Sequence, residues 1–252
     1  MVVESIDFIL TARTSQLEIV LPQPFTIPED CTAEIGLRNL CFYHSIPNVS
    51  RTNNSILLKI PGSGWEIFHF IPGCYEIDML ATALSDFLQF KFPEKRKIIE
   101  ENFKLSADDA TGKSVFTFKI DGFGVNFDTD NSIAELLGFT KNTKLFATGI
   151  HHSPNTVNIS NVAYIIVNCN ISAMNFMNDR KIPAIFTAVL DVAPGYRFFR
   201  EQTNISYKLL NTTSFSHLLV WLSDEHHELL NLRGEEVVCT LTIRITPKND
   251  KN

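Results

Sequence analysis

The segment Asp224–Glu228 gathers two adjacent histidines with three carboxylates, which are side chains that can bind a metal. Neighbouring residues on a strand point to opposite faces, however, and the i, i+4 histidine spacing of a helical zinc site is absent. The pattern therefore favours a charged, solvated turn over a metal centre. The same reasoning applies to His151 and His152, which are followed by Ser153 and Pro154.

Local patterns for other catalytic sites are missing as well. The chain has no GxSxG segment, and Pro61–Gly64 lacks the Lys-Ser/Thr pair and the following helix of a phosphate-binding loop. A dyad assembled from residues far apart in the sequence would leave no local pattern. From these residues we expect that the protein is not an enzyme and that it binds neither a cofactor nor a metal.

The segment Leu230–Val237 admits two interpretations. Gly234 can adopt a positive φ, and Arg233 lies close to Glu235 and Glu236, which favours a polar corner before a final strand. Alternatively, Arg233 faces a neighbouring subunit.

Composition indicates a globular, sheet-rich protein. The chain has 252 residues, of which 44% are hydrophobic and 20% charged, and it contains 20 phenylalanines, a residue that suits pleated surfaces. The net charge of −6 argues against nucleic acid as a specific partner. Five scattered cysteines without a CxxC pair indicate reduced, mostly buried thiols. The sequence shows neither a signal peptide nor an apolar run long enough to span a membrane.

Short apolar runs bounded by turn residues predict strands along most of the chain. The predicted strands are 5–10, 16–21, 32–43, 56–60, 65–71, 115–120, 124–128, 162–171, 184–192, 205–210, 216–224 and 236–245. Three prolines within 22–30 predict a connector after the second strand. The phenylalanine-rich segment 193–204 is expected to be a loop.

Two helices are predicted within the connections between strands. Residues 75–88 place apolar side chains at three- and four-residue spacing, and residues 132–139 combine a serine cap with a glycine end. Many strands with few helices predict an all-β fold, an antiparallel jelly-roll sandwich. Nothing marks a domain boundary, so we expect a single elaborated domain over 1–252, with a short disordered tail from about residue 247.

A family resemblance emerges from the order of several turn-and-strand segments over most of the chain. These segments are 45–55, 71–78, 135–139, 153–160, 167–171, 193–196 and 232–245. Their order resembles the penton, or minor capsid, proteins of Polinton (Maverick) elements and adintoviruses, which virophage pentons resemble in turn. The chain departs from the family pattern at Cys74, where serine or threonine is usual, and at His226 and His227, where a glycine-containing turn is usual.

The resemblance implies a jelly-roll capsid protein that forms homopentamers at the vertices of an icosahedral particle. It also implies a double jelly-roll major capsid protein as partner and a location in the virion after synthesis in the host cytoplasm. Residues in two loops and a corner are candidates for the subunit interface: Asn48, Arg51, Asn53, Asn54, Tyr196, Arg197, Phe198, Phe199 and Arg233. The alternative function is a β-sandwich that binds a glycan or a host receptor, with Trp65 and Trp221 as candidates that lie in apolar, buried-looking runs.

Overall fold

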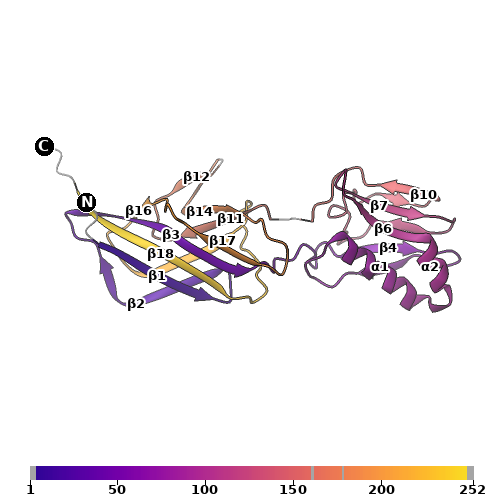
Figure 1. The fold of residues 1–252 in the computed structure, drawn as a ribbon, viewed down its shortest axis with the longest axis horizontal. Coiled ribbons are helices and arrows are strands. Elements are labelled where there is room, and N and C mark those ends of the chain that lie inside the picture. The colour runs from indigo at the N-terminus through magenta and orange to yellow at the C-terminus, as the bar shows by residue number, and fades with distance from the viewer. Residues whose placement is uncertain (1–3, 160–161, 178, 249–252) are drawn as a thin grey trace. The chain divides into compact units, whose positions relative to one another are not determined.

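The computed structural model describes residues 4–159, 162–177 and 179–248 (Figure 1). In place of the single domain expected from the sequence, the chain divides into two compact units, each with its own hydrophobic core. The first, the sandwich unit, comprises Met1–Ile46 and Val162–Asn252, and the second, the inserted unit, comprises Pro47–Asn161. The last strand ends at Pro247, and the predicted disordered tail falls largely on residues 249–252, outside the described residues.

The sandwich unit contains two antiparallel sheets. The first has the order β1-β18-β3-β15, with β16 also paired to β3, and the second has the order β14-β11-β17-β2. The strands are β1 (Glu4–Ala12), β2 (Gln16–Thr26), β3 (Cys31–Tyr43), β11 (Tyr164–Cys169), β14 (Ala184–Val189), β15 (Arg197–Glu201), β16 (Lys208–Leu209), β17 (Ser214–Ser223) and β18 (Val237–Pro247). The chain crosses repeatedly from one sheet to the other, which is the jelly-roll arrangement. The predicted all-β jelly-roll class is confirmed.

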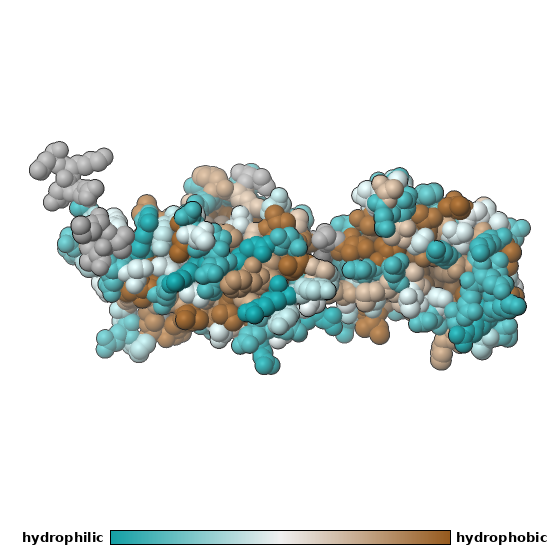
Figure 2. All heavy atoms as spheres, in the orientation of Figure 1, coloured by the Kyte–Doolittle hydropathy of each residue, from teal (hydrophilic) through white to brown (hydrophobic). Residues whose placement is uncertain are grey.

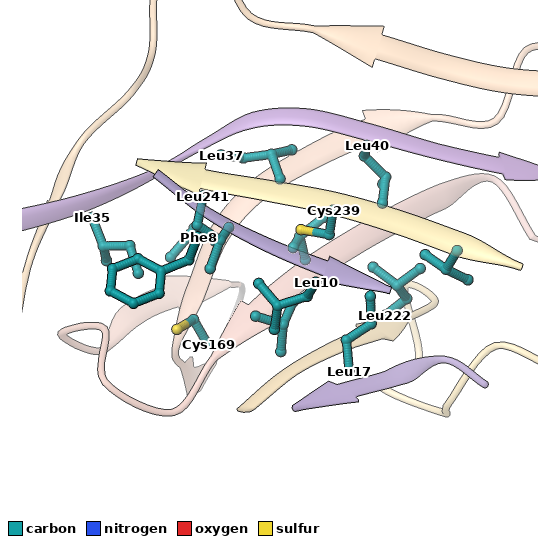
Figure 3. Packing of buried hydrophobic residues seen from close by; sticks show 14 of the residues in the cluster. Phe8, Leu10, Leu17, Ile35, Leu37, Leu40, Cys169, Leu222, Cys239 and Leu241 are labelled. Atoms are coloured by element: carbon teal, nitrogen blue, oxygen red, sulfur yellow. The ribbon is translucent and has the colours of Figure 1, made fainter. Parts of the chain in front are cut away.

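The core of the sandwich unit lies between these sheets (Figure 3). Leu241 and Cys239 of β18 point inward and lie opposite Leu37 and Leu40 of β3, because alternate residues of a strand share a face. Burial raises the pKa of the Cys169 and Cys239 thiols to about 12, so both remain protonated at neutral pH.

Strand β2 corrects the predicted proline connector. Pro22 and Pro24 lie within this strand, which among the described residues is paired with β17 alone. An edge strand tolerates proline, since the missing amide donor is not required on its open side. The pairing with β17 is also irregular here, passing from Val20 opposite His217 to Phe25 opposite Phe215.

Strand β15 corrects the loop predicted over 193–204. Its backbone pairs with β3 from Arg197 opposite Tyr43 to Glu201 opposite Asn39. The pairing turns Phe198 into the core, where its ring lies 4.9 Å from that of Phe42. A short hairpin, β12 (Asn175–Met177) with β13 (Arg180–Ile182), was also absent from the sequence prediction.

The inserted unit combines two small sheets with helices. The sheets have the orders β5-β4-β8-β9 and β10-β7-β6. The elements are β4 (Ser55–Lys59), β5 (Glu66–His69), α1 (Ile77–Lys91), η1 (Pro93–Lys95), α2 (Arg96–Asn102), β6 (Phe103–Asp108), β7 (Lys113–Phe118), β8 (Gly124–Asn126), β9 (Lys144–Leu145) and β10 (Gly149–His152). Strands β7 and β8, which lie on either side of Asp121 and Gly122, belong to different sheets.

Helix α1 forms where its apolar spacing predicted it. Ile77, Leu80, Leu84 and Leu88 are buried along one face, and the helix packs against β6. Helix α2 was missed because its sequence is mostly charged and only Ile99 is buried. None of the helices in the described ranges is long and apolar enough to cross a membrane.

The helix predicted over 132–139 is wrong. The Ser132 hydroxyl accepts a hydrogen bond from the amide of Ala134 at 3.2 Å, and Gly138 has φ +75°, as the capping pattern suggested. Between these two ends the chain forms consecutive turns instead of a regular helix. The segment is too short to propagate beyond one turn, since helix formation gains one hydrogen bond per added residue only after a costly nucleus.

Phenylalanine concentrates in the inserted unit. Twelve of the 20 phenylalanines lie in Pro47–Asn161. Phe116 is fully buried at the centre of a cluster, with ring centroids 6.0–6.4 Å from those of Phe103, Phe118, Phe127 and Phe139. The excess of phenylalanine therefore fills a small core that aromatic contacts hold together.

Candidate functional site

The Asp-Glu-His-His-Glu segment forms a turn between β17 and β18, as the sequence predicted. The Asp224 carboxylate accepts hydrogen bonds from the amides of His226 at 2.8 Å and Glu228 at 2.9 Å. The amide of Asp224 donates to the carbonyl of Glu228 at 2.9 Å, and His227 adopts φ 69°. Asp224 thus closes the turn upon itself. The residues that the structure describes include no group of three or more metal-ligating side chains.

Glu225 in the same turn ties it to the start of β11. Its carboxylate accepts hydrogen bonds from the amides of Ala163 at 3.1 Å and Tyr164 at 3.2 Å. Burial acts to raise the pKa of Glu225, but the backbone hydrogen bonds favour the charged form and hold the pKa below its ordinary value of 4.5.

We expect the Glu225→Gln substitution to lower the free energy of unfolding by about 1 kcal/mol at pH 7, since the amide accepts weaker hydrogen bonds than the carboxylate. The folded-state pKa is depressed, so this difference is fully present above pH 4.5 and is lost as the pH falls through the folded-state pKa. Urea unfolding of both proteins between about pH 2 and about pH 7, a range that includes the titration of a carboxyl group, measures it. A difference that is constant over this range would contradict the assignment.

The second histidine pair lies in a strand, so the turn predicted for it is wrong. His151 and His152 end β10, and the Nε2 atom of His151 is 2.7 Å from the carbonyl oxygen of Ala147. The Nδ1 atom of His152 lies 4.0 Å from a carboxylate oxygen of Asp108. The two imidazoles therefore have different surroundings, as adjacent positions on a strand require.

The first candidate interface loop contains a residue that the structure places in the interior. Asn48 is buried, and its amide nitrogen donates to the carbonyl oxygens of Tyr75 at 2.7 Å and Ile159 at 3.0 Å. Its amide oxygen accepts from the amide of Tyr75 at 2.9 Å. The interface assignment of Asn48 is corrected: this buried side chain joins three segments of the inserted unit.

We expect Asn48→Ala to lower the free energy of unfolding of the inserted unit by about 2 kcal/mol, since it leaves buried backbone groups without their partners. Asn54→Ala is the matched control, because the half-buried Asn54 donates a single bond, to Phe70 at 2.9 Å. Asn54→Ala should lower the free energy of unfolding by about 0.5 kcal/mol. Equal effects of the two substitutions in chemical denaturation would contradict the structural role of Asn48.

The remaining residues of this loop form a compact turn with one projecting side chain. Asn53 accepts from the amide of Ser50 at 2.6 Å and donates to the carbonyl of Asn48 at 2.9 Å. Arg51 is exposed at the tip. Arg51, Asn53 and Asn54 stay predictions for the subunit interface, with the two asparagines also shaping the loop.

The second candidate segment alternates between core and surface. Phe198 is fully buried, so its interface assignment is corrected: the pairing of β15 points it into the sandwich. Tyr196 and Phe199 are exposed, and they stay predictions for an interface. The Nε atom of Arg197 lies 2.8 Å from the sulfur of Cys41, which holds the guanidinium against β3.

The structure brings Arg197 close to the corner that contains Arg233. A hollow of about 570 Å³ in the sandwich unit is lined by both the Arg197 side chain and the segment Gly234–Glu236. Arg233 is exposed and adopts φ 53°, and its amide donates to the side chain of Asn231 at 3.1 Å. The polar corner predicted from the sequence is therefore present, and contact of Arg233 with another subunit stays a prediction.

A larger hollow, of about 720 Å³, was not found from the sequence. It lies between β14, the β12–β13 hairpin and Lys208 of β16, and its wall is mostly apolar. Phe176 of the hairpin lines this hollow while remaining 73% exposed. Apolar side chains reach the molecular surface in several places (Figure 2). One feature of the sequence could have indicated this hollow: the apolar residues Met174, Phe176 and Met177 stand in an otherwise polar segment. The apolar run is too short to predict a strand.

The two tryptophans considered for glycan binding are both half-buried. Trp65 belongs to the inserted unit, where its ring lies 5.6 Å from that of Phe146, and Trp221 belongs to β17 of the sandwich unit.

The likeness of this chain to known proteins lies in its fold. No protein-family model and no curated protein sequence matches the chain. A solved structure does: the crystal structure of the selenomethionine-labelled mavirus penton protein. The chain shares the fold of this penton protein. The match covers 96% of this chain and 100% of the penton chain, with a TM-score of 0.51 and 12% sequence identity.

Proposed function

We propose that this protein is a structural capsid protein that forms the pentameric vertex of an icosahedral particle. The observation that carries the proposal is the likeness to the mavirus penton protein, which extends over 96% of the chain and includes both units. A likeness over one unit alone would support only a common sandwich fold.

The sequence resemblance adds the finer parts of the proposal. It points to the pentons of Polinton elements and adintoviruses, to a double jelly-roll major capsid protein as the neighbouring shell protein, and to a location in the virion after synthesis in the host cytoplasm. A non-enzymatic role agrees with the geometry of the charged turn, in which Asp224 and Glu225 hold backbone amides.

The first test is the native mass of the purified protein, measured by light scattering behind size exclusion at several concentrations. We expect a mass near five chains and ring-shaped particles in negative-stain images. Co-expression with a double jelly-roll major capsid protein should then place the rings at particle vertices. A protein that stays monomeric at high concentration would contradict the proposal, and glycan arrays would become the next measurement.

A further inference from the structure

The sandwich unit has two sides, each formed by the edge strands of both sheets. Strands β1 and β2 are edges of the two sheets and pack against one another. At the other ends of the two sheet orders lie β14 and, each paired with β3, strands β15 and β16; residues of β14 and Lys208 of β16 line the hollow of about 720 Å³. We call these the β1/β2 side and the β14/β16 side.

The chain segments that form the two sides differ in charge. Residues 4–26, which form β1, β2 and their turn, carry three acidic side chains and one arginine, a net charge of −2. Residues 175–209, which run from β12 to β16, carry five basic and three acidic side chains, a net charge of +2. Complementary charge of this kind steers association and fixes which surfaces meet.

Each side also carries apolar side chains in contact with solvent. Ile9 of β1 and Val20 of β2 are 66% and 73% exposed on the β1/β2 side, each on the outer face of its own sheet. On the β14/β16 side Phe176 is 73% exposed beside the apolar hollow, with Met174 and Leu209 exposed near it. An apolar centre inside a charged rim is the usual anatomy of a protein interface.

The edge strands differ in their capacity to accept a further strand. Pro22 and Pro24 have no amide donor, so the open edge of β2 is less able to pair with a further strand. Strand β14, from Ala184 to Val189, contains no proline, and its pairing within the described residues is with β11 alone. The open edge and the hollow therefore coincide on the β14/β16 side.

We propose that the β14/β16 side of one copy of this chain receives the β1/β2 side of the next copy. Because the two surfaces are different, the contact is heterologous, and repetition about a rotation axis closes a ring. Phe176 and the hollow form the apolar centre of the contact, and the oppositely charged residues form its rim. This inference rests on the proposed ring-forming function and assigns the surfaces that build the ring.

The test uses one substitution on each side. Phe176→Asp and Val20→Asp place a charge in the apolar centre, and each should raise the concentration needed for ring formation by roughly 30-fold or more. Phe90→Asp is the matched control, since Phe90 is 87% exposed on α1 of the inserted unit. It should assemble like the original protein. Circular dichroism confirms that all three variants are folded.

A mixing experiment distinguishes a heterologous contact from other arrangements. Phe176→Asp keeps an intact β1/β2 side, and Val20→Asp keeps an intact β14/β16 side. Mixed in equal amounts, the two variants share one good interface, so they should form a species of two chains that neither forms alone.

The outcomes separate this inference from the proposed function. Rings that persist in Phe176→Asp or in Val20→Asp, or a mixture that stays monomeric, would overturn the surface assignment while the ring-forming function stands. An original protein that never associates would overturn both.

Discussion

Replacing Gly138 with alanine should destabilise the inserted unit by about 4 kcal/mol. Gly138 has φ +75°, where a side chain costs about 1–2 kcal/mol. A Cβ atom there would also lie 2.3 Å from the carbonyl oxygen of Asn155 and 3.0 Å from that of Thr156. Both neighbours are backbone atoms, and the amide of Asn155 donates to the carbonyl of Gly138 at 3.1 Å, so the contact cannot relax cheaply.

The Gly62→Ala substitution measures the cost of a positive φ without a steric clash, and so serves as the control for Gly138→Ala. Gly62 lies in the same unit with φ +73°, and the nearest atom to its added Cβ is the flexible Lys95 Nζ at 3.5 Å. We expect a cost of about 1 kcal/mol at this position. Urea unfolding followed by Trp65 fluorescence, in a Trp221→Phe background, reports on the inserted unit alone. Equal losses for the two glycine substitutions would contradict the close packing at Gly138.

Strands were predictable wherever burial fixed their pattern. The run 236–245 is nearly continuous in apolar and β-branched residues because β18 is paired on both sides, by β1 and β3, within the first sheet. Helix α1 was equally clear, since its buried residues recur at three- and four-residue spacing. In both elements local sequence and tertiary burial specify the same structure.

Predictions failed where tertiary contacts overrode the local signal. Strand β15 lies within the segment that was expected to be a loop, but its pairing with β3 buries Phe198, which stands between Arg197 and Phe199. The turn around Gly138 has helix-capping chemistry, yet the carbonyl of Leu136 accepts from the amide of Asn158 at 2.9 Å instead of serving a helix. In both cases the partner, β3 or Asn158, lies too far along the chain for a local sequence pattern to include it.

The domain insertion left no mark on the sequence for a related reason. The chain enters the inserted unit between Ile46 and Pro47, and it returns near Val162, among residues that suit a strand. Neither junction has a glycine-rich sequence, so composition predicts one domain. The β14/β16 side was hidden as well, because a surface made by three separate segments has no sequence motif.

Replacing Phe116 with alanine should cost the inserted unit about 4 kcal/mol, comparable with the loss at Gly138. The side chain is fully buried among four other phenylalanine rings, so its removal leaves a cavity. Phe116→Leu keeps most of the volume and should cost about 1.5 kcal/mol. Phe90→Ala, at an exposed position, should have little effect. A loss at Phe116 no greater than at Phe90 would contradict the packing of this core.

The two sites of largest effect are connected through Phe139. Its ring lies 6.0 Å from that of Phe116, and its amide donates to the carbonyl of Ala134 at 2.9 Å, directly after Gly138. A clash at Gly138 displaces the turn that positions this ring, so it already loosens the phenylalanine cluster. The double variant should therefore lose at least 0.5 kcal/mol less than the sum of the two single losses, the smallest coupling expected of residues in contact. Strict additivity in the same fluorescence measurement would mean that the turn and the cluster are independent.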